Sequence, residues 1–135
     1  MNECLFCRIV GKEISAYLIY EDEMALAFLD IHPKAPGHAV VVPKVHAERL
    51  SNLAEEYVAP LFLAVQRVTQ AVRERLHADG CTIGINEGRA GGQAVEHLHV
   101  HVLPRFEGDG GGSIHSVVEN PPKESLEALQ EKLQQ

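Results

Sequence analysis

Five consecutive residues, His97-Leu98-His99-Val100-His101, alternate between imidazole and apolar side chains. Because successive side chains of a β-strand point to opposite faces, this alternation predicts a strand over residues 95–103 with three histidines on one face. The other face is apolar and belongs to the core. Histidines two residues apart lie roughly 6.6 Å apart at Cα and the outer two roughly 13 Å apart. Two imidazoles can therefore converge on one atom, whereas all three hardly can.

The spacing of the histidines allows three interpretations. They can form the solvated face of an edge strand, although Lys, Thr or Glu is more usual there and three imidazoles repel one another once charged. Two histidines at i and i+2 can also ligate zinc with a third ligand from elsewhere. Finally, a neutral imidazole can attack phosphorus while a neighbouring imidazole holds or delivers a proton. Spacing alone does not separate these interpretations.

The rest of the pattern predicts an α+β domain with a mostly antiparallel sheet of about five strands, one long helix and short terminal helices. Pro60 fits only a first turn, which places the start of the long helix near that residue, and Pro104 is expected to end the histidine strand. The glycine-rich run at 108–112 predicts a flexible loop, so we expect one domain over residues 1–107, followed by this loop and a C-terminal helix over residues 108–135. The predicted strands cover residues 16–20, 24–29, 38–43, 81–86 and 95–103, and the predicted helices cover residues 5–11, about 53–76 and 123–133.

The charge balance and the termini exclude some classes of protein. A formal net charge of −7 argues against a general nucleic-acid binder. No stretch approaches the roughly 20 apolar residues of a membrane helix and the N-terminus lacks a signal-peptide pattern, so we expect a cytoplasmic protein without membrane contact. Three cysteines fit a reducing compartment. Cys4 and Cys7 form a C-x-x-C pair, which indicates either half a metal site or redox pair, or two small buried residues on a helix.

Other motifs accompany the histidine strand. Gly92-Gln93-Ala94-Val95 directly precedes it, and earlier segments lie at residues 4–10, 27–31, 36–46 and 86–88. With the pattern His-x-His-x-His-x-x, these segments resemble the histidine triad (HIT) family in their order and over residues 4–107. The resemblance implies a HIT-like fold for nearly the whole predicted domain.

The resemblance also implies catalytic roles. In the proteins that this chain resembles, the middle histidine attacks the α-phosphate of a nucleotide derivative and gives a nucleotidyl-histidine intermediate. That residue is His99 here. The resemblance further implies that His101 contacts the phosphate and the leaving group, and that His38 supports the triad by hydrogen bonding from the neighbouring strand.

The nucleotide-binding residues implied by the resemblance fall into base walls, ribose ligands and phosphate ligands. The base walls are Leu5, Phe6, Ile9, Phe28 and Ile31, the ribose ligands are Asp30 and Asn86, and the phosphate ligands are Gly92, Gln93, Ala94, His99 and His101. A glycine-containing loop can bring backbone N–H groups close to phosphate, which explains how an acidic protein can stabilise a phosphorane. The expected partner is an adenosine or other purine nucleotide.

A metal and a second copy of the chain are also implied. Some relatives bind structural zinc through a cysteine pair and two histidines, which correspond here to Cys4, Cys7, His46 and His97. Such a Cys2His2 site is closed and structural. It leaves the other two triad histidines for phosphate chemistry. The family resemblance further implies a homodimer with two sheets joined edge to edge.

The favoured function is therefore hydrolysis or transfer at the α-phosphate of AMP derivatives or dinucleoside polyphosphates. One alternative is a zinc enzyme that uses the histidine pair for catalysis, and another is a zinc-binding, nucleotide-binding or scaffold protein with little activity. Ala94 stands where many relatives of the Hint branch carry Ser or Thr, which weakens the case for phosphoramidate cleavage. Residues 104–110 resemble those of bacterial Hit proteins and dinucleoside-polyphosphate hydrolases.

Overall fold

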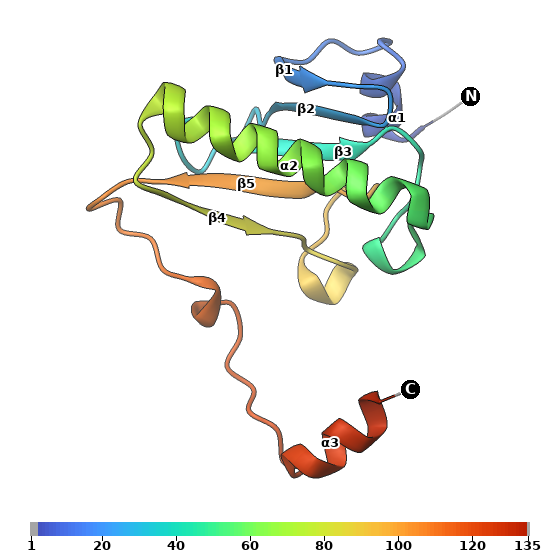
Figure 1. Ribbon diagram of the computed structural model, residues 1–135, viewed down its shortest axis with the longest axis vertical. Helices are drawn as coiled ribbons and strands as arrows, with labels where there is room; N and C mark the ends of the chain where they lie inside the picture. The colour runs from blue at the N-terminus through green and yellow to red at the C-terminus, as the bar shows by residue number, and fades with distance from the viewer. Residues whose placement is uncertain (1–2, 135) are drawn as a thin grey trace.

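The computed structural model describes residues 3–134 and contains one five-stranded antiparallel sheet with the order β1-β2-β3-β5-β4 (Figure 1). The predicted α+β fold is confirmed. The strands are β1 (Leu18–Glu21), β2 (Ala25–Leu29), β3 (Ala39–Pro43), β4 (Gly80–Gly84) and β5 (Val100–Arg105), and the α-helices are α1 (Leu5–Val10), α2 (Glu55–Leu76) and α3 (Leu126–Leu133).

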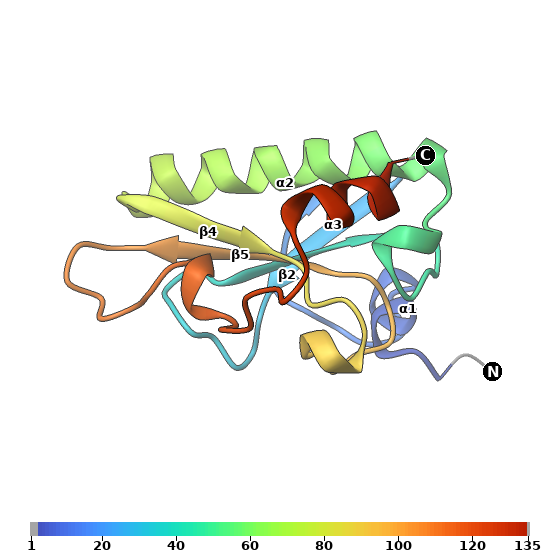
Figure 2. The same ribbon diagram turned by 90° about the horizontal axis from the view of Figure 1, so that it is seen from below.

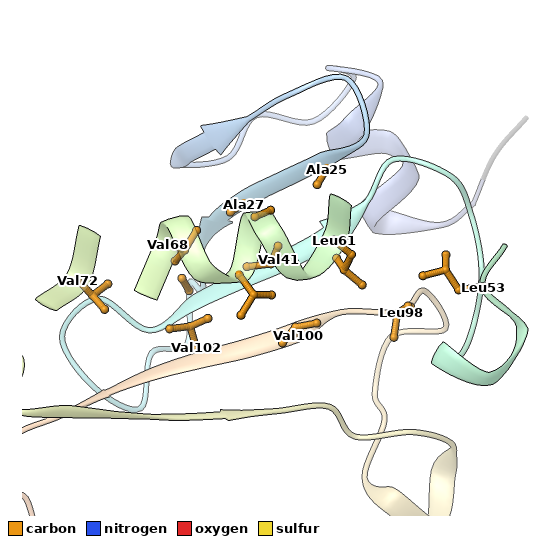
Figure 3. Close-up of a cluster of buried hydrophobic side chains, with 13 residues drawn as sticks. Ala25, Ala27, Val41, Leu53, Leu61, Val68, Val72, Leu98, Val100 and Val102 are labelled. Atoms are coloured by element: carbon orange, nitrogen blue, oxygen red, sulfur yellow. The ribbon is translucent and has the colours of Figure 1, made fainter. Parts of the chain in front are cut away.

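The long helix α2 covers one face of the sheet (Figures 1 and 2). Its buried positions recur at helical spacing, as in Leu61, Val65 and Val68, so one stripe of the helix faces the strands. Figure 3 shows this stripe packed against apolar residues of the central strands, including Val41 and Val100. Burial of these side chains is the main force that holds helix and sheet together.

A second, smaller core lies on the opposite face of the sheet, under α1. Phe6 and Ile9 of this short helix pack there with Phe28 and Val40. Both faces of β2 and β3 are consequently buried, which explains why these strands are apolar at nearly every position instead of alternating.

Both boundaries that were predicted from proline positions were wrong. Helix α2 begins at Glu55, so Pro60 lies in its second turn instead of its first. The missing N–H removes one hydrogen bond close to the helix start, and the buried stripe that begins at Leu61 offsets this loss. Strand β5 begins at Val100 instead of Val95 and runs through Pro104, which pairs with Cys81 of β4. Pro104 lies beyond the last residue that β3 pairs, where β5 has a neighbour on one side only.

The C-terminal segment leaves the sheet after β5 and carries α3 away from it (Figure 1). None of the α3 residues is buried, and Leu126 and Leu133 are largely exposed. The predicted helix over residues 123–133 is therefore present but starts at Leu126, where the Ser125 hydroxyl caps it by accepting the Ala128 N–H. Within residues 3–134, no helix has the length and apolar character needed to cross a bilayer.

Candidate active site and metal centre

The three histidines of the alternating run lie on the α1 side of the sheet. Leu98 and Val100 point to the α2 side and belong to its core, as the alternation predicts. His97 and His99 are nonetheless outside β5, because the segment before Val100 is irregular. Its backbone leaves the ladder to reach other partners: the Leu98 N–H donates to the Ala47 carbonyl at 2.7 Å. The side chains of residues 97–99 therefore still alternate between the two faces, although this segment is not paired as a regular strand.

His99 is buried and its ring orientation is defined by two contacts. Its Nδ1 lies 2.7 Å from the backbone carbonyl of His97. A carbonyl can only accept, so Nδ1 carries the proton and Nε2 keeps a lone pair in the neutral ring. The Phe6 ring meets the His99 ring edge to face, with centroids 5.1 Å apart. In the neutral ring this arrangement orients the Nε2 lone pair.

His101 is part of a hydrogen-bonded chain that starts at a backbone amide. The Lys34 N–H donates to His38 Nδ1 at 3.1 Å, and His38 Nε2 lies 2.9 Å from His101 Nδ1. Because the amide can only donate, neutral His38 must carry its proton on Nε2 and donate it to His101. Neutral His101 therefore carries its own proton on Nε2. The hydrogen bonds give the two neighbouring histidines opposite characters: in their neutral forms His99 presents a lone pair and His101 presents an N–H donor.

The electrostatics keep this chain neutral near pH 7. Burial lowers the pKa of His38, although the Asp30 carboxylate, 3.6 Å from its Nε2, acts in the opposite direction. Burial also lowers the pKa of His101, and the neighbouring His99 and His38 rings lower it further. Both pKa values fall below the usual 6.5, so the neutral tautomers described above are the populated ones at neutral pH.

The expected metal ligands come together in one cluster. The ligand atoms of Cys4, Cys7, His46 and His97 all lie within 4.8 Å of one another. His97 Nδ1 is 3.4 Å from the Cys4 sulfur and 3.5 Å from the Cys7 sulfur, and His46 Nδ1 is 3.3 Å from the Cys7 sulfur. The two cysteines belong to the start of α1, where Cys4 is the N-cap and its sulfur accepts the Cys7 N–H.

The protonation of His97 fits a metal ligand. Its Nε2 lies 3.0 Å from the Pro43 carbonyl, which can only accept, so the proton is on Nε2 and the Nδ1 lone pair faces the sulfurs. A backbone carbonyl that holds the distal N–H of a ligating histidine is the usual second partner in zinc sites. Two sulfurs and two imidazole nitrogens at this separation match a closed tetrahedral site.

A second group of possible ligands does not fit a metal. Asp30, His38 and His101 also place one ligand atom each within 4.8 Å. A cation there would need the lone pair of His38 Nε2, but the Lys34 N–H occupies Nδ1 and forces the proton onto Nε2. The same contact leaves this group with one N–H donor at its end, on His101 Nε2.

The residues expected to surround the base are partly assembled. Phe6, Ile9 and Phe28 share one buried cluster, and the Phe6 and Phe28 rings meet with centroids 5.4 Å apart. Leu5 and Ile31 are exposed instead, Ile31 by 71%. They are free to cover a planar ring that lies against this side of the domain.

The residues expected to contact ribose and phosphate lie in two places. Asp30 follows β2 and its carboxylate accepts the His32 N–H at 2.8 Å. Asn86 follows β4, and its side chain lies beside Gly92, whose φ of +93° requires glycine. Ala94 is exposed. The Gln93 carboxamide contacts the backbone, because its Nε2 donates to the Glu48 and Val95 carbonyls.

Several contacts of the site involve residues that sequence reasoning did not single out. The Lys34 N–H and the carbonyls of Pro43 and Ala47 act through the backbone, which leaves no side-chain signal in the sequence. Glu87 is different: its carboxylate accepts N–H and hydroxyl groups of residues 50–51 at 2.8–3.4 Å. No local pattern connects positions 36 residues apart.

Comparison with known proteins identifies relatives of this chain. A family model described as HIT domain matches residues 11–108. A HIT-like protein from Methanocaldococcus jannaschii is 44% identical over 107 residues, which cover 79% of this chain and 82% of that protein. The crystal structure of a zinc-bound histidine triad family protein from Mycobacterium smegmatis is 47% identical, with a TM-score of 0.76, and the match covers 80% of this chain and 78% of that chain.

A HIT family hydrolase from Legionella pneumophila is a third example. Its crystal structure is 36% identical and has a TM-score of 0.66, and the match covers 75% of this chain and 91% of that chain. The family match spans the sheet, α2 and all three histidines of the alternating run. The chain therefore belongs to the HIT domain family, within the superfamily of nucleotide-binding hydrolases and transferases.

Proposed function

We propose that this protein cleaves nucleotide derivatives at the α-phosphate through a covalent nucleotidyl intermediate on His99. The observation that carries the proposal is the 2.7 Å contact between His99 Nδ1 and the His97 carbonyl, which leaves the Nε2 lone pair free. The backbone carbonyl fixes the proton of the neutral ring on Nδ1, so the other nitrogen can attack phosphorus directly.

The reaction proceeds in two displacements. In the first, His99 Nε2 forms a bond to the α-phosphorus, the bond from phosphorus to the leaving group breaks, and the His101 Nε2–H donates a hydrogen bond to the departing atom. In the second, the oxygen of a water molecule attacks phosphorus, the P–N bond breaks and His99 Nε2 regains its lone pair. One proton of that water is released to solvent and balances the proton that the leaving group takes up from solvent. The products are the nucleoside monophosphate and the protonated leaving group, and both histidines end in their starting tautomers.

The surrounding residues bind and orient the substrate in this scheme. The cluster of Phe6, Ile9 and Phe28, with Leu5 and Ile31 at its edge, forms the wall for a purine base. Asp30 and Asn86 bind the ribose, and the Ala94 N–H donates to the phosphate. The Gly92 N–H donates to the Arg89 carbonyl, so Gly92 contributes by the absence of a side chain, which lets the phosphate approach the loop closely. These assignments rest on the HIT pattern and on the cluster of Phe6, Ile9 and Phe28, in which Phe6 contacts the His99 ring.

The metal supplies structure in this proposal. Cys4, Cys7, His46 and His97 would hold zinc, whose bound form clamps the start of α1 to the segment that carries the triad. Four protein ligands leave no open position for substrate, so the chemical step belongs to the two other triad histidines.

We also propose that the protein is a homodimer. Strand β4 is an edge of the sheet, and Ile83 on it is 39% exposed. Pairing of two such edges satisfies their backbone groups and removes a site of nonspecific association. Light scattering coupled to size exclusion measures the mass directly, and a monomer at all concentrations contradicts this assignment.

The covalent intermediate is the decisive test of the function. The protein is mixed with a dinucleoside polyphosphate, an AMP ester or an AMP phosphoramidate, quenched in acid and analysed by mass spectrometry for AMP on His99. We expect the adduct in the wild type, its absence in His99→Ala, and its retention in His115→Ala, which removes an exposed histidine of the tail. Nucleotide binding without any adduct or AMP release contradicts the proposal and supports a binding or scaffold protein.

A further inference from the structure

The loop that precedes the histidines is fastened to a second segment of the chain. This segment, residues 46–51, is called the strap here, and residues 86–95 are called the glycine loop. At one end of the strap His46 joins the cysteine cluster, and next to it the Ala47 carbonyl accepts the Leu98 N–H. At the other end the Leu50 N–H and the Ser51 hydroxyl donate to Glu87 of the glycine loop.

Gln93 makes the contact in the middle. Its Nε2 donates to the Glu48 carbonyl at 2.8 Å and to the Val95 carbonyl at 2.9 Å, while its Oε1 accepts the Gly88 N–H at 2.8 Å. The Gln93 N–H in turn donates to the Gly88 carbonyl at 3.0 Å. Carbonyls only accept and amides only donate, so the orientation of this carboxamide is unambiguous.

These contacts occupy the N–H donors of the Gln93 side chain, which a phosphate would need. Both amide hydrogens of Gln93 are committed to backbone carbonyls, and phosphate oxygens accept but do not donate. Gln93 could bind a phosphate only by breaking one of the bonds to Glu48 or Val95 and leaving that carbonyl without its partner.

We propose that Gln93 is a positioning residue that clamps the glycine loop to the strap and gives the loop its phosphate-binding shape, without itself contacting the phosphate. Glu87 is the second clamp of the same unit. The strap is exposed at His46, Glu48 and Leu50, and only Ala47 packs against the core, so polar bonds supply much of what holds it in place. Segments of this kind open locally at low cost once a bond is removed.

The first test needs no nucleotide and therefore does not depend on the proposed function. Hydrogen exchange of the nucleotide-free protein is compared among the wild type, Gln93→Ala and the control Gln70→Ala, an exposed glutamine of α2. We expect the amides of Leu98 and Leu50 to exchange about tenfold faster in Gln93→Ala only, because several bonds worth about 1 kcal/mol each are lost. Neither amide is bonded to Gln93, so faster exchange reports release of the strap, and unchanged exchange overturns the proposal.

The second test compares AMP with adenosine by calorimetry and rests on the proposed function. Gln93→Ala and Glu87→Ala should each weaken AMP binding about fivefold and leave adenosine binding within about twofold. Removal of the Glu87 charge would strengthen AMP binding if only Coulomb repulsion mattered, so the sign of the change is diagnostic. The double variant should bind AMP about as weakly as the weaker single variant, because both substitutions break one unit.

The outcomes are distinguishable. Equal losses for AMP and adenosine indicate a general structural defect and overturn the positioning role, as do additive losses in the double variant or tighter AMP binding by Glu87→Ala. A wild-type protein that binds neither ligand refutes the proposed function, while the exchange measurement still decides whether Gln93 clamps the strap.

Discussion

Acid should destabilise the metal-free protein chiefly through His97. This side chain is fully buried, and burial is the largest influence that lowers its pKa, from 6.5 to about 4. As the pH falls below 6.5 the unfolded chain binds a proton that the folded chain does not, so acid favours unfolding. The stability that His97 contributes is fully present above pH 6.5 and is lost as the pH falls toward about 4.

The magnitude follows from the difference between the two pKa values. Each pKa unit corresponds to 1.36 kcal/mol, so a gap of about 2.5 units corresponds to about 3 kcal/mol of unfolding free energy. His97 has no exposed surface in this structure, so solvent screening does not reduce this figure. A loss of this size is a large part of the total stability of a domain.

The assay is urea unfolding of chelator-treated protein at several values between pH 4 and pH 7.5, with His97→Gln as the comparison. The variant lacks the titrating ring but keeps an amide donor for the Pro43 carbonyl. The depressed pKa values of His38 and His101 act in the same direction in both proteins and cancel in the difference. The wild type should lose about 3 kcal/mol more than the variant, and parallel curves would refute the reasoning.

Three further predictions concern the metal, the nucleophile and the backbone. Cys7→Ser should reduce bound zinc from one per chain to near zero by plasma mass spectrometry and lower the thermal midpoint, because a closed four-ligand site loses a thiolate. Phe6→Leu should cost about 1–2 kcal/mol in urea unfolding and slow formation of the covalent adduct, because the aromatic contact that orients His99 is lost. Gly37→Ala should cost about 1 kcal/mol, because its φ of +84° disfavours any Cβ, while the nearby Leu76 methyl group can move aside.

The Cys7 and Gly37 predictions each have a matched control in the chain. Cys81→Ser changes a cysteine outside the metal cluster and should keep the zinc. Gly80→Ala adds a methyl group where nothing lies within 4 Å and φ is ordinary, so it should leave stability nearly unchanged. Zinc retained by the Cys7 variant, adduct formation at the normal rate in the Phe6 variant, or equal stability of the two glycine variants would each contradict the corresponding prediction.

Local patterns were sufficient for most of the fold. The apolar spacing along residues 61–72 indicated the long helix, and β-branched runs indicated β3, because these periodicities follow directly from helix and strand geometry. The boundaries at Pro60 and Pro104 were wrong because the cost of one missing N–H depends on what surrounds it. The packing of the helix against the sheet offsets that cost at Pro60. At Pro104 the cost is small because β5 has no neighbouring strand on one side.

The sequence predicted which residues belong to the candidate site, but it did not predict the hydrogen bonds that they make. The ligand atoms of Cys4 and His97 meet as expected, although the residues are 93 positions apart. Gln93 was assigned to phosphate from its place in the motif, yet its amide is bonded to backbone groups of Glu48 and Val95. A motif states which side chain is present and does not state which carbonyls approach it.

The alternation of residues 97–101 by itself determined that three histidines share one face and that the residues between them enter the core. This follows from the pleat of an extended chain, which assigns every second side chain to the same side. Only the tertiary structure decided which nitrogen of each histidine carries the proton. The carbonyls of Pro43 and His97 and the amide of Lys34 determine these protonation sites. Every residue carries a backbone carbonyl and, except for proline, a backbone N–H, so the sequence does not indicate which of these groups will lie beside a histidine. Their positions depend on the fold alone.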